Sequence, residues 1–267
     1  MSEEKALDGG NAESQRSILI TGAASGIGCA TARLFARRGW FVGCLDMNRG
    51  GLVALQDDLG SVKGFFRALD VTDREALLSA LAEFGTAAGG RLDLLFNNAG
   101  IDAKGRFETM PWETVVTVVN VNLVAGLSLI HGAIPLLRAT KGSLCLSTAS
   151  ASAIFGTANL AVYSATKHAI KGLTEALSVE LAEHGVRCAD ILPGIVDTGM
   201  LTPRQKASLP KEGMLRVLPA EAVADTVWEA YQGNNVHWYV PSELRGYDIE
   251  VTTRPEAARD RRIAGSY

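Results

Sequence analysis

Cysteine and histidine are scarce in this chain of 267 residues, which contains four of each. No two cysteines form a CxxC pair and the histidines lack metal-ligand spacing, so neither residue type predicts a metal site. The cysteines are Cys29, Cys44, Cys145 and Cys188. Three of them lie in apolar, strand-like runs, and we expect small buried side chains in a reducing cytoplasm rather than disulfides.

An excess of charge of either sign is also lacking, because 26 basic residues face 29 acidic ones and give a net charge of -3. This balance disfavours a nucleic-acid-binding or membrane-surface protein. No apolar run of about 18 residues is uninterrupted. The nearest one, residues 115–130, contains two asparagines and a glycine, and we expect a buried helix there. Residues 1–16 are polar and lack the apolar centre of a signal peptide, which predicts a disordered leader.

Short apolar runs alternate with longer helical segments from residue 17 onward. The expected strands are residues 17–21, 40–46, 64–70, a part of 91–100, 143–148, 186–192 and 236–240. The expected helices are residues 26–38, 50–59, 73–88, 111–137, 163–184 and 220–232. The alternation predicts an α/β fold, in which a single domain over residues 17–267 contains a doubly wound, Rossmann-like parallel sheet with helices on both faces.

A glycine-rich turn, TGAASGIG, joins the first expected strand to the first expected helix. Gly22, Gly26 and Gly28 remove side chains where the backbone must turn tightly and approach a ligand. The free N–H groups at the start of the helix would bind an anion such as a pyrophosphate. Many such turns bind nothing, but this one follows the first strand of a doubly wound pattern, which favours a dinucleotide.

Asp46 stands at the end of the second expected strand. A carboxylate at this place accepts hydrogen bonds from both adenosine ribose hydroxyls and repels a 2′-phosphate. Ala23, Ala24 and Met47 supply no compensating cation, and Arg49 is the nearest one. NAD is therefore expected rather than NADP, and the alternative is that Asp46 merely caps the next helix.

Tyr163 and Lys167 in YSATK are four residues apart, which places them on the same face of a helix. The pKa of an ordinary tyrosine is about 10, too high for a base at neutral pH. A neighbouring ammonium favours the phenolate, so we expect Lys167 to lower the pKa of Tyr163. The phenolate could then accept the proton of an alcohol as hydride leaves. Pairs with this spacing also occur on solvated helix faces.

Together, these motifs resemble the short-chain dehydrogenase/reductase family from about residue 17 to 197. TGAASGIG matches the TGxxxGxG turn of that family, and NNAG, YSATK and PGIVDT match three further motifs in the same order. The resemblance implies an oxidoreductase that interconverts a secondary alcohol and a ketone with NAD. Other readings are a non-catalytic NAD(H) sensor, an NADP-dependent carbonyl reductase, and a sugar-nucleotide epimerase or dehydratase. The last of these commonly has a longer chain and a TGxxGxxG turn.

The resemblance also implies four catalytic residues: Asn122, Ser150, Tyr163 and Lys167. Tyr163 would be the acid/base, Lys167 would also hold the nicotinamide ribose, Ser150 would orient the substrate oxygen, and Asn122 would hold a proton-relay water. Ser147 and Ser152 compete with Ser150. Asn120 competes with Asn122, because the stretch from Trp112 is longer than the usual pattern.

For the coenzyme, the resemblance implies contacts at the ends of several strands, and Tyr163 and Lys167 would take part. The further residues are Gly22, Ser25, Gly26, Ile27, Gly28, Asp46, Asp70, Val71, Asn98, Ala99, Gly100, Pro193, Ile195 and Thr198. Asn97 and Asn98 could equally form a turn that satisfies its own backbone.

Residues 199–217 are long, lack periodicity and contain two prolines, and we expect a lid over a small-molecule alcohol or ketone. Its apolar members, Met200, Leu201, Leu209, Met214 and Leu215, suggest a hydrophobic substrate body. Lys206, Lys211 and Arg216 accompany them, and Asp102, Ser152 and Phe155 are expected beside the reacting carbon. Steroids, aromatic alcohols, hydroxy fatty derivatives and polyols stay open.

The C-terminus lacks the glycine-rich segment with which many family members end. Because the last helix and strand of the family often build one face of a tetramer, a homo-oligomer is expected, and a dimer and a tetramer both stay open.

Overall fold

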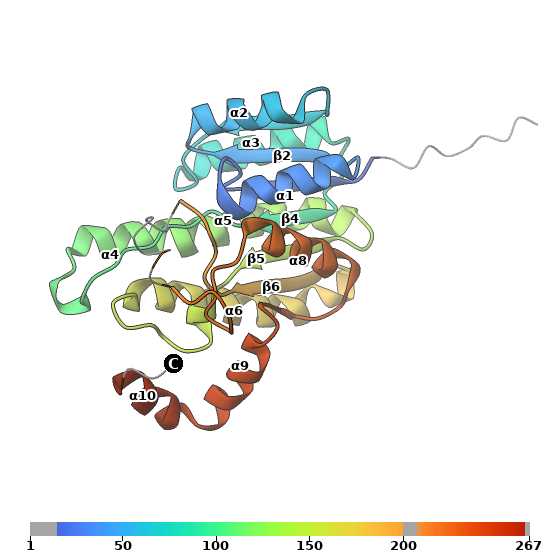
Figure 1. Ribbon diagram of the computed structural model, residues 1–267. Coiled ribbons are helices and arrows are strands. Elements are labelled where there is room, and N and C mark those ends of the chain that lie inside the picture. Colours follow the sequence, from blue (N-terminus) through green and yellow to red (C-terminus); the bar gives the residue numbers. More distant parts are fainter. Residues whose placement is uncertain (1–14, 200–206, 208, 265–267) are drawn as a thin grey trace, which may run out of the picture.

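One parallel sheet organises the described part of the chain (Figure 1). The computed structural model describes residues 15–199, 207 and 209–264. The sheet has seven strands in the order β3-β2-β1-β4-β5-β6-β7, and every neighbouring pair is parallel. The strands are β1 Ser17–Thr21, β2 Phe41–Asp46, β3 Gly64–Ala68, β4 Leu94–Asn97, β5 Leu144–Thr148, β6 Arg187–Pro193 and β7 His237–Val240. The order reverses between β1 and β4, which is where open α/β sheets bind ligands.

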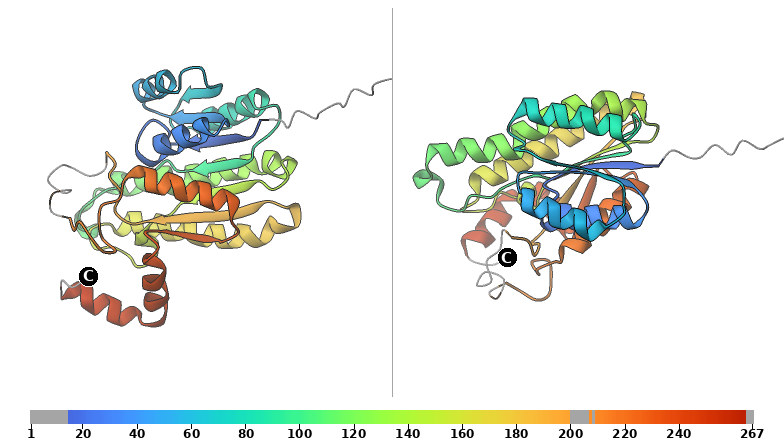
Figure 2. Two further views of the ribbon diagram at one scale, coloured as in Figure 1. Left: turned by 45° about the vertical axis from the view of Figure 1, so that its right-hand side comes forward. Right: turned by 90° about the horizontal axis from the view of Figure 1, so that it is seen from above.

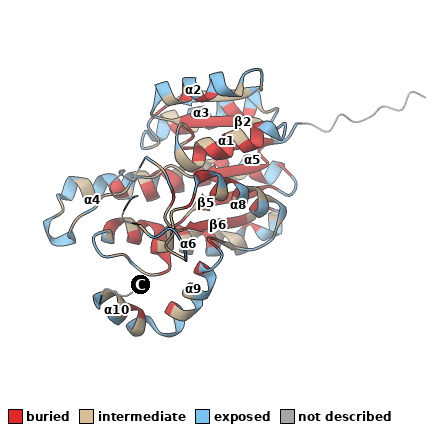
Figure 3. Ribbon diagram, in the orientation of Figure 1, coloured by how far each residue is buried: buried red, intermediate tan, exposed pale blue. Residues whose placement is uncertain are grey.

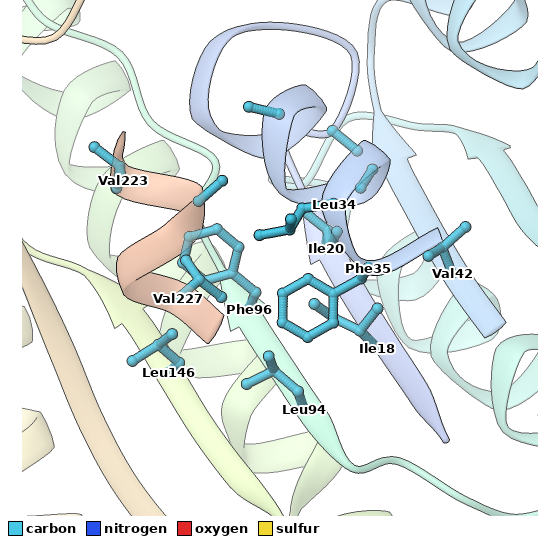
Figure 4. Packing of buried hydrophobic residues seen from close by; sticks show 14 of the residues in the cluster. Ile18, Ile20, Leu34, Phe35, Val42, Leu94, Phe96, Leu146, Val223 and Val227 are labelled. Carbon is cyan, nitrogen blue, oxygen red and sulfur yellow. The ribbon is translucent and has the colours of Figure 1, made fainter. Parts of the chain in front are cut away.

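Helices cover both faces of the sheet (Figure 2). The helices are α1 Gly26–Arg37, α2 Arg49–Leu59, α3 Arg74–Ala87, α4 Trp112–Val119, α5 Ala125–Ala139, α6 Ala161–Glu180, α8 Ala220–Gln232, α9 Leu244–Thr253 and α10 Pro255–Ile263. On one face α1, α2 and α8 pack against the strands, as Phe35, Phe96 and Val227 illustrate (Figure 4). On the other face α3, α5 and α6 pack against the strands, where Phe84 and Leu129 are fully buried. These layers confirm the predicted doubly wound fold.

The strands lie between two helix layers, which explains their nearly continuous apolar sequences. All five residues of β1 are buried, and so are all four of β4 (Figure 3). The expected strands agree with the observed ones to within a few residues. The four cysteines carry free thiols, and all but the half-buried Cys29 are buried.

The long helix expected at residues 111–137 is interrupted. A π-helix, Asn120–Val124, joins α4 to α5. In a π-helix the backbone hydrogen bonds join residues five apart rather than four apart. The combined segment Trp112–Ala139 is apolar and long enough to cross a membrane by length and composition alone, although only a third of its most apolar window is buried. The expectation of a buried helix at residues 115–130 is therefore wrong for one side of it: Val118 and Leu129 are buried, whereas Val116 and Val124 are exposed.

Two helices at the C-terminal end, α9 and α10, were not predicted. They follow β7 and project from the β7 side of the sheet beneath the segment after β5 (Figure 1). The expected leader lies outside the described residues except for Gln15 and Arg16. The side chain of Gln15 donates to the carbonyl of Gly39, and the carbonyl of Arg16 accepts the N–H of Phe41. Of the expected lid, residues 200–206 and 208, which include Met200, Leu201 and Lys206, also lie outside them.

Candidate active site

The glycine-rich turn after β1 closes tightly because its glycines lack side chains. Gly22 and Gly26 have φ angles of +67° and +49°, which favour glycine. A Cβ atom added at Gly28 would overlap the carbonyl oxygen of Gly22. Helix α1 begins at Gly26, and the side chain of the preceding Ser25 does not cap it. The turn has the tight geometry that the sequence predicted, and the binding of a pyrophosphate there stays a prediction.

Asp46 fixes this turn to the end of β2. One carboxylate oxygen accepts the N–H of Ala24 at 2.9 Å, and the other accepts the N–H of Asn48 at 2.8 Å. The cap of α2 is Asn48, whose side chain accepts the N–H of Gly51 at 3.0 Å. The alternative that Asp46 caps this helix is therefore wrong, and its carboxylate lies next to the glycine turn.

Asn98 connects three strands at the same edge of the sheet. Its side chain donates to the carbonyl oxygen of Thr21 at 3.0 Å and accepts from the hydroxyl of Thr148 at 3.0 Å. The hydroxyl of Thr21 in turn accepts the N–H groups of Asn98 and Ala99, both at 3.0 Å. The Asn98 side chain thus holds the walls of the crevice, in addition to its predicted place beside the coenzyme. This role of Thr21 was not predicted from the sequence, although Thr21 is the first residue of the TGAASGIG turn.

The remaining predicted coenzyme residues are distributed around this crevice. Thr198 approaches the turn, because a Cβ added at Gly26 would lie 2.9 Å from its methyl carbon. Pro193 ends β6, and the carbonyl of Ile195 accepts the N–H of Leu218 at 2.8 Å. Asp70 accepts the N–H of Thr72 at 2.8 Å in an exposed turn. Val71 lines a small hollow that also contacts Thr21 and Ala99, and Ile27 packs partly against the core.

Asn122 lies in the π-helix and points inward, whereas Asn120 is exposed. Its side chain donates to the carbonyl of Ile101 at 2.9 Å and accepts the N–H of Ile101 at 2.8 Å. It is 3% exposed, and a Cβ added at Gly100 would lie 3.4 Å from its oxygen. Of the two candidate asparagines, the structure therefore places Asn122 at the site. The π-helix accounts for the unusually long spacing in the sequence.

Ser150, Tyr163 and Lys167 meet where β5 and α6 approach each other. The side chain of Ser150 lies close enough to the hydroxyl of Tyr163 to lower its pKa. Lys167 donates to the carbonyl of Thr148 at 2.7 Å, and its Nζ atom lies 5.6 Å from the centre of the Tyr163 ring. The competing serines have other contacts: Ser147 contacts Asn97, and Ser152 contacts Thr157. The Thr148 contact was not predictable from residue type, because it uses a backbone oxygen.

The expected effect of Lys167 on Tyr163 is wrong for these residues by themselves. The pKa of Tyr163 is raised, because burial of the phenol outweighs the effect of the Ser150 side chain that lowers it, and the charge of Asp102 raises it further. Burial lowers the pKa of Lys167 to about 8. The site therefore contains a neutral phenol beside an amine that loses its proton readily.

A parallel sheet with a phosphate-type turn after β1 and a Ser–Tyr–Lys cluster at its strand ends defines a nucleotide-dependent oxidoreductase of the Rossmann type. Among the residues that the structure describes, no group of three His, Cys, Asp or Glu side chains could hold a metal ion. The family model for short chain dehydrogenases matches residues 16–208, and the chain belongs to this family.

Similar proteins include oxidoreductases with different substrates. The chain is 34% identical over 195 residues to a cyclohexanol dehydrogenase of Acinetobacter sp. (strain SE19), a match that covers 72% of this chain and 78% of the other. It is 34% identical over 247 residues to a momilactone A synthase of Oryza sativa subsp. japonica, with 91% and 84% covered. It is also similar to the structure of a 3-ketoacyl-(acyl-carrier-protein) reductase from Brucella melitensis complexed with NADH. That match has a TM-score of 0.76 and 27% identity, and it covers 84% of this chain and 96% of the other.

The glycine turn leads to a first prediction. Replacement of Gly28 by alanine should weaken NADH binding about 10- to 100-fold, because the new methyl group forces the turn open at a cost of about 1–3 kcal/mol. Titration of NADH fluorescence measures this affinity. Gly172→Ala is the matched control, because a Cβ at this exposed position of α6 meets no atom within 4 Å. If the two variants bind NADH with equal affinity, the glycine turn is not part of the binding site.

Proposed function

We propose that this chain is an NAD-dependent dehydrogenase that interconverts a secondary alcohol and a ketone by hydride transfer. The observation that carries the proposal is the cluster of Ser150, Tyr163 and Lys167 at the end of β5, in a parallel sheet whose first strand ends in the glycine turn. The proposal is also supported by similarity to a relative named cyclohexanol dehydrogenase. When bound, the nicotinamide ring supplies the hydride acceptor or donor and, in its oxidised form, a positive charge.

Each residue of the cluster has a distinct role in this proposal. Tyr163 transfers the proton of the substrate oxygen, and Ser150, which lies close to its hydroxyl, orients that oxygen. Lys167 holds the ribose and returns a proton to Tyr163, for which a pKa of about 8 suits it. Asn122 is fixed to Ile101 by two hydrogen bonds and positions the water through which Lys167 exchanges protons.

The preference for NAD is proposed from the place of Asp46. Its carboxylate is held at the glycine turn by the N–H groups of Ala24 and Asn48. A 2′-phosphate next to this carboxylate would be repelled, while two ribose hydroxyls would be accepted. An NADP-dependent carbonyl reductase is the second candidate, since several members of the family reduce ketones. A non-catalytic NAD(H) sensor is a third, and the presence of Tyr163 and Lys167 argues against it.

We further propose that the chain forms a homo-oligomer through the outer side of α4 and α5. Trp112, Val116, Val124 and Leu127 are all at least 39% exposed there, although they are large and apolar. Light scattering after size-exclusion chromatography should give at least a dimer, and Val124→Lys with Leu127→Lys should shift the equilibrium to monomers. A wild-type monomer at micromolar concentration would contradict the proposal. The cytoplasmic location suggested by the cysteines stays a prediction.

Loss of the phenolic hydroxyl tests the catalytic role. Tyr163→Phe should reduce kcat about 10²- to 10⁴-fold, because proton transfer to the substrate oxygen is lost, while NADH still binds. The measurement is NADH absorbance across a panel of secondary alcohols and ketones. Since burial raises the pKa of Tyr163 above its ordinary value, wild-type oxidation of alcohols should increase continuously as the pH rises from neutral, whereas ketone reduction should not.

The control for this variant is Tyr231→Phe, which removes a phenolic hydroxyl far from the cluster, next to Trp40. Turnover of Tyr163→Phe equal to that of this control would exclude Tyr163 as the acid/base. Tight NADH binding by the wild type without turnover on any panel member would instead favour the sensor.

The coenzyme preference gives a separate prediction. NADH should bind at least about tenfold more tightly than NADPH, since repulsion between the carboxylate and a phosphate costs about 1–4 kcal/mol at close range. Asp46→Ser should reduce that ratio. Asp57→Ser removes the same charge from an exposed position of α2 and should leave it unchanged. Tighter binding of NADPH by the wild type would favour the carbonyl reductase.

A further inference from the structure

The two C-terminal helices, α9 and α10, lie outside the part of the chain that the family model matches, which ends at residue 208. They form an arm that leaves the end of β7 and turns back beneath the segment following β5 (Figure 1). That segment begins with Ala149 and includes Ser150 and the short 3₁₀ helix Ala151–Ala153. The arm therefore lies against the residues that flank Ser150 in the sequence.

The first half of the arm, α9, is fixed to the helix that carries Tyr163 and Lys167. Asp248 of α9 forms an ion pair with Lys171 at 2.9 Å, one helical turn after Lys167. The hydroxyl of Tyr239 donates to the same carboxylate oxygen at 2.6 Å. Both members of the ion pair are largely buried, with side chains 18% and 13% exposed. Burial opposes the charge of Asp248, yet its pKa is lowered, because these hydrogen bonds stabilise the carboxylate.

The arm also shares an apolar core with the segment after Ser150. Leu244, Val251 and Ala258 of the arm are at most 5% exposed. They pack in one cluster with Ala153 and Ile154 of that segment. Met214, from the described end of the expected lid, packs against the same cluster. The arm, the serine segment and the base of the lid therefore form one apolar unit on the substrate side.

Arg262 on α10 connects the far end of the arm to the same segment. Its guanidinium lies 5.0 Å from the centre of the Phe155 ring, five residues after Ser150. It also donates to the hydroxyl of Tyr247 on α9 at 3.0 and 3.3 Å. A cation over an aromatic face is attracted by the ring, so Arg262 restricts where Phe155 can move. Phe155 itself is only half-buried.

We propose that Arg262 of the arm is a positioning residue that holds Phe155 as the wall against a bulky apolar group of the substrate. The inference rests on the proposed function, since it states which side chains contact the part of the alcohol or ketone that is remote from the reacting carbon. A substrate with a ring or branched apolar body gains from a fixed wall, whereas a small alcohol does not reach it.

A comparison of substrate sizes tests the proposal. For Arg262→Met, kcat/KM with 1-phenylethanol should fall at least about tenfold, because the wall is displaced, while kcat/KM with propan-2-ol stays within about twofold. Arg262→Lys keeps the cation and should restore part of the loss, and Tyr247→Phe should show a smaller loss. Arg259→Met is the control, because Arg259 lies on the same helix, is exposed and pairs with Asp260.

Equal losses on both alcohols, or none, would overturn the proposal. A wild-type enzyme inactive on every alcohol and ketone would instead contradict the proposed function, and a second measurement then still tests the role of Arg262. The amides of Ser152, Ala153 and Ile154 are hydrogen-bonded to Ser150 and Ala151. Hydrogen exchange of this peptide, followed by mass spectrometry, should be faster in Arg262→Met than in Arg259→Met. Identical exchange in the two variants would refute the positioning role.

Discussion

The hydrogen bond from the buried ammonium of Lys167 to the carbonyl of Thr148, at 2.7 Å, is the contact on which the geometry of the site depends. It joins α6 to the end of β5 and so determines where Tyr163, one turn earlier, meets Ser150. A charged lysine with a carbonyl rather than a carboxylate as its partner is poorly compensated, which explains why burial lowers its pKa to about 8. The same burial raises the pKa of Tyr163.

These two shifts change how the Tyr–Lys pair should be understood. With ordinary pKa values of about 10 for both groups, a tyrosine and a lysine are almost equally strong acids. In this site the lysine is the stronger acid, so at neutral pH the described residues by themselves favour a neutral phenol beside a lysine that is still mostly protonated. Under the proposed function, the phenolate therefore forms only when a positive charge enters with the ligand. On that proposal, Tyr163 acts as a base only in the complex with the coenzyme, which would limit the chemistry to the assembled complex.

Much of the fold and of the coenzyme side could be predicted from the sequence, because both depend on local patterns. The alternation of apolar strands and helices fixes a parallel sheet, and glycines such as Gly28 are required where a Cβ would overlap the backbone. The sign of the Tyr163 shift could not be predicted, since it depends on how deeply the phenol is enclosed. The π-helix at Asn122 was visible only as an anomalous spacing. The contact of Lys167 with a backbone oxygen has no signature in residue types.

The proposed substrate side, in contrast, depends on contacts between residues that are far apart in the sequence. Phe155 and Arg262 are 107 positions apart, and only the packing of α9 against α6 brings their side chains together. Under the proposed function, the strand ends hold the coenzyme turn, whereas the helices that follow the last strand hold the far wall of the substrate site. Helix α6 belongs to both halves, because it carries Tyr163 and Lys167 near its start and Lys171 one turn later. The arm is fixed to α6 by the ion pair of Asp248 with Lys171, whereas the glycine turn is fixed by Asp46 and Asn98, so a change in the arm leaves the contacts of the glycine turn in place.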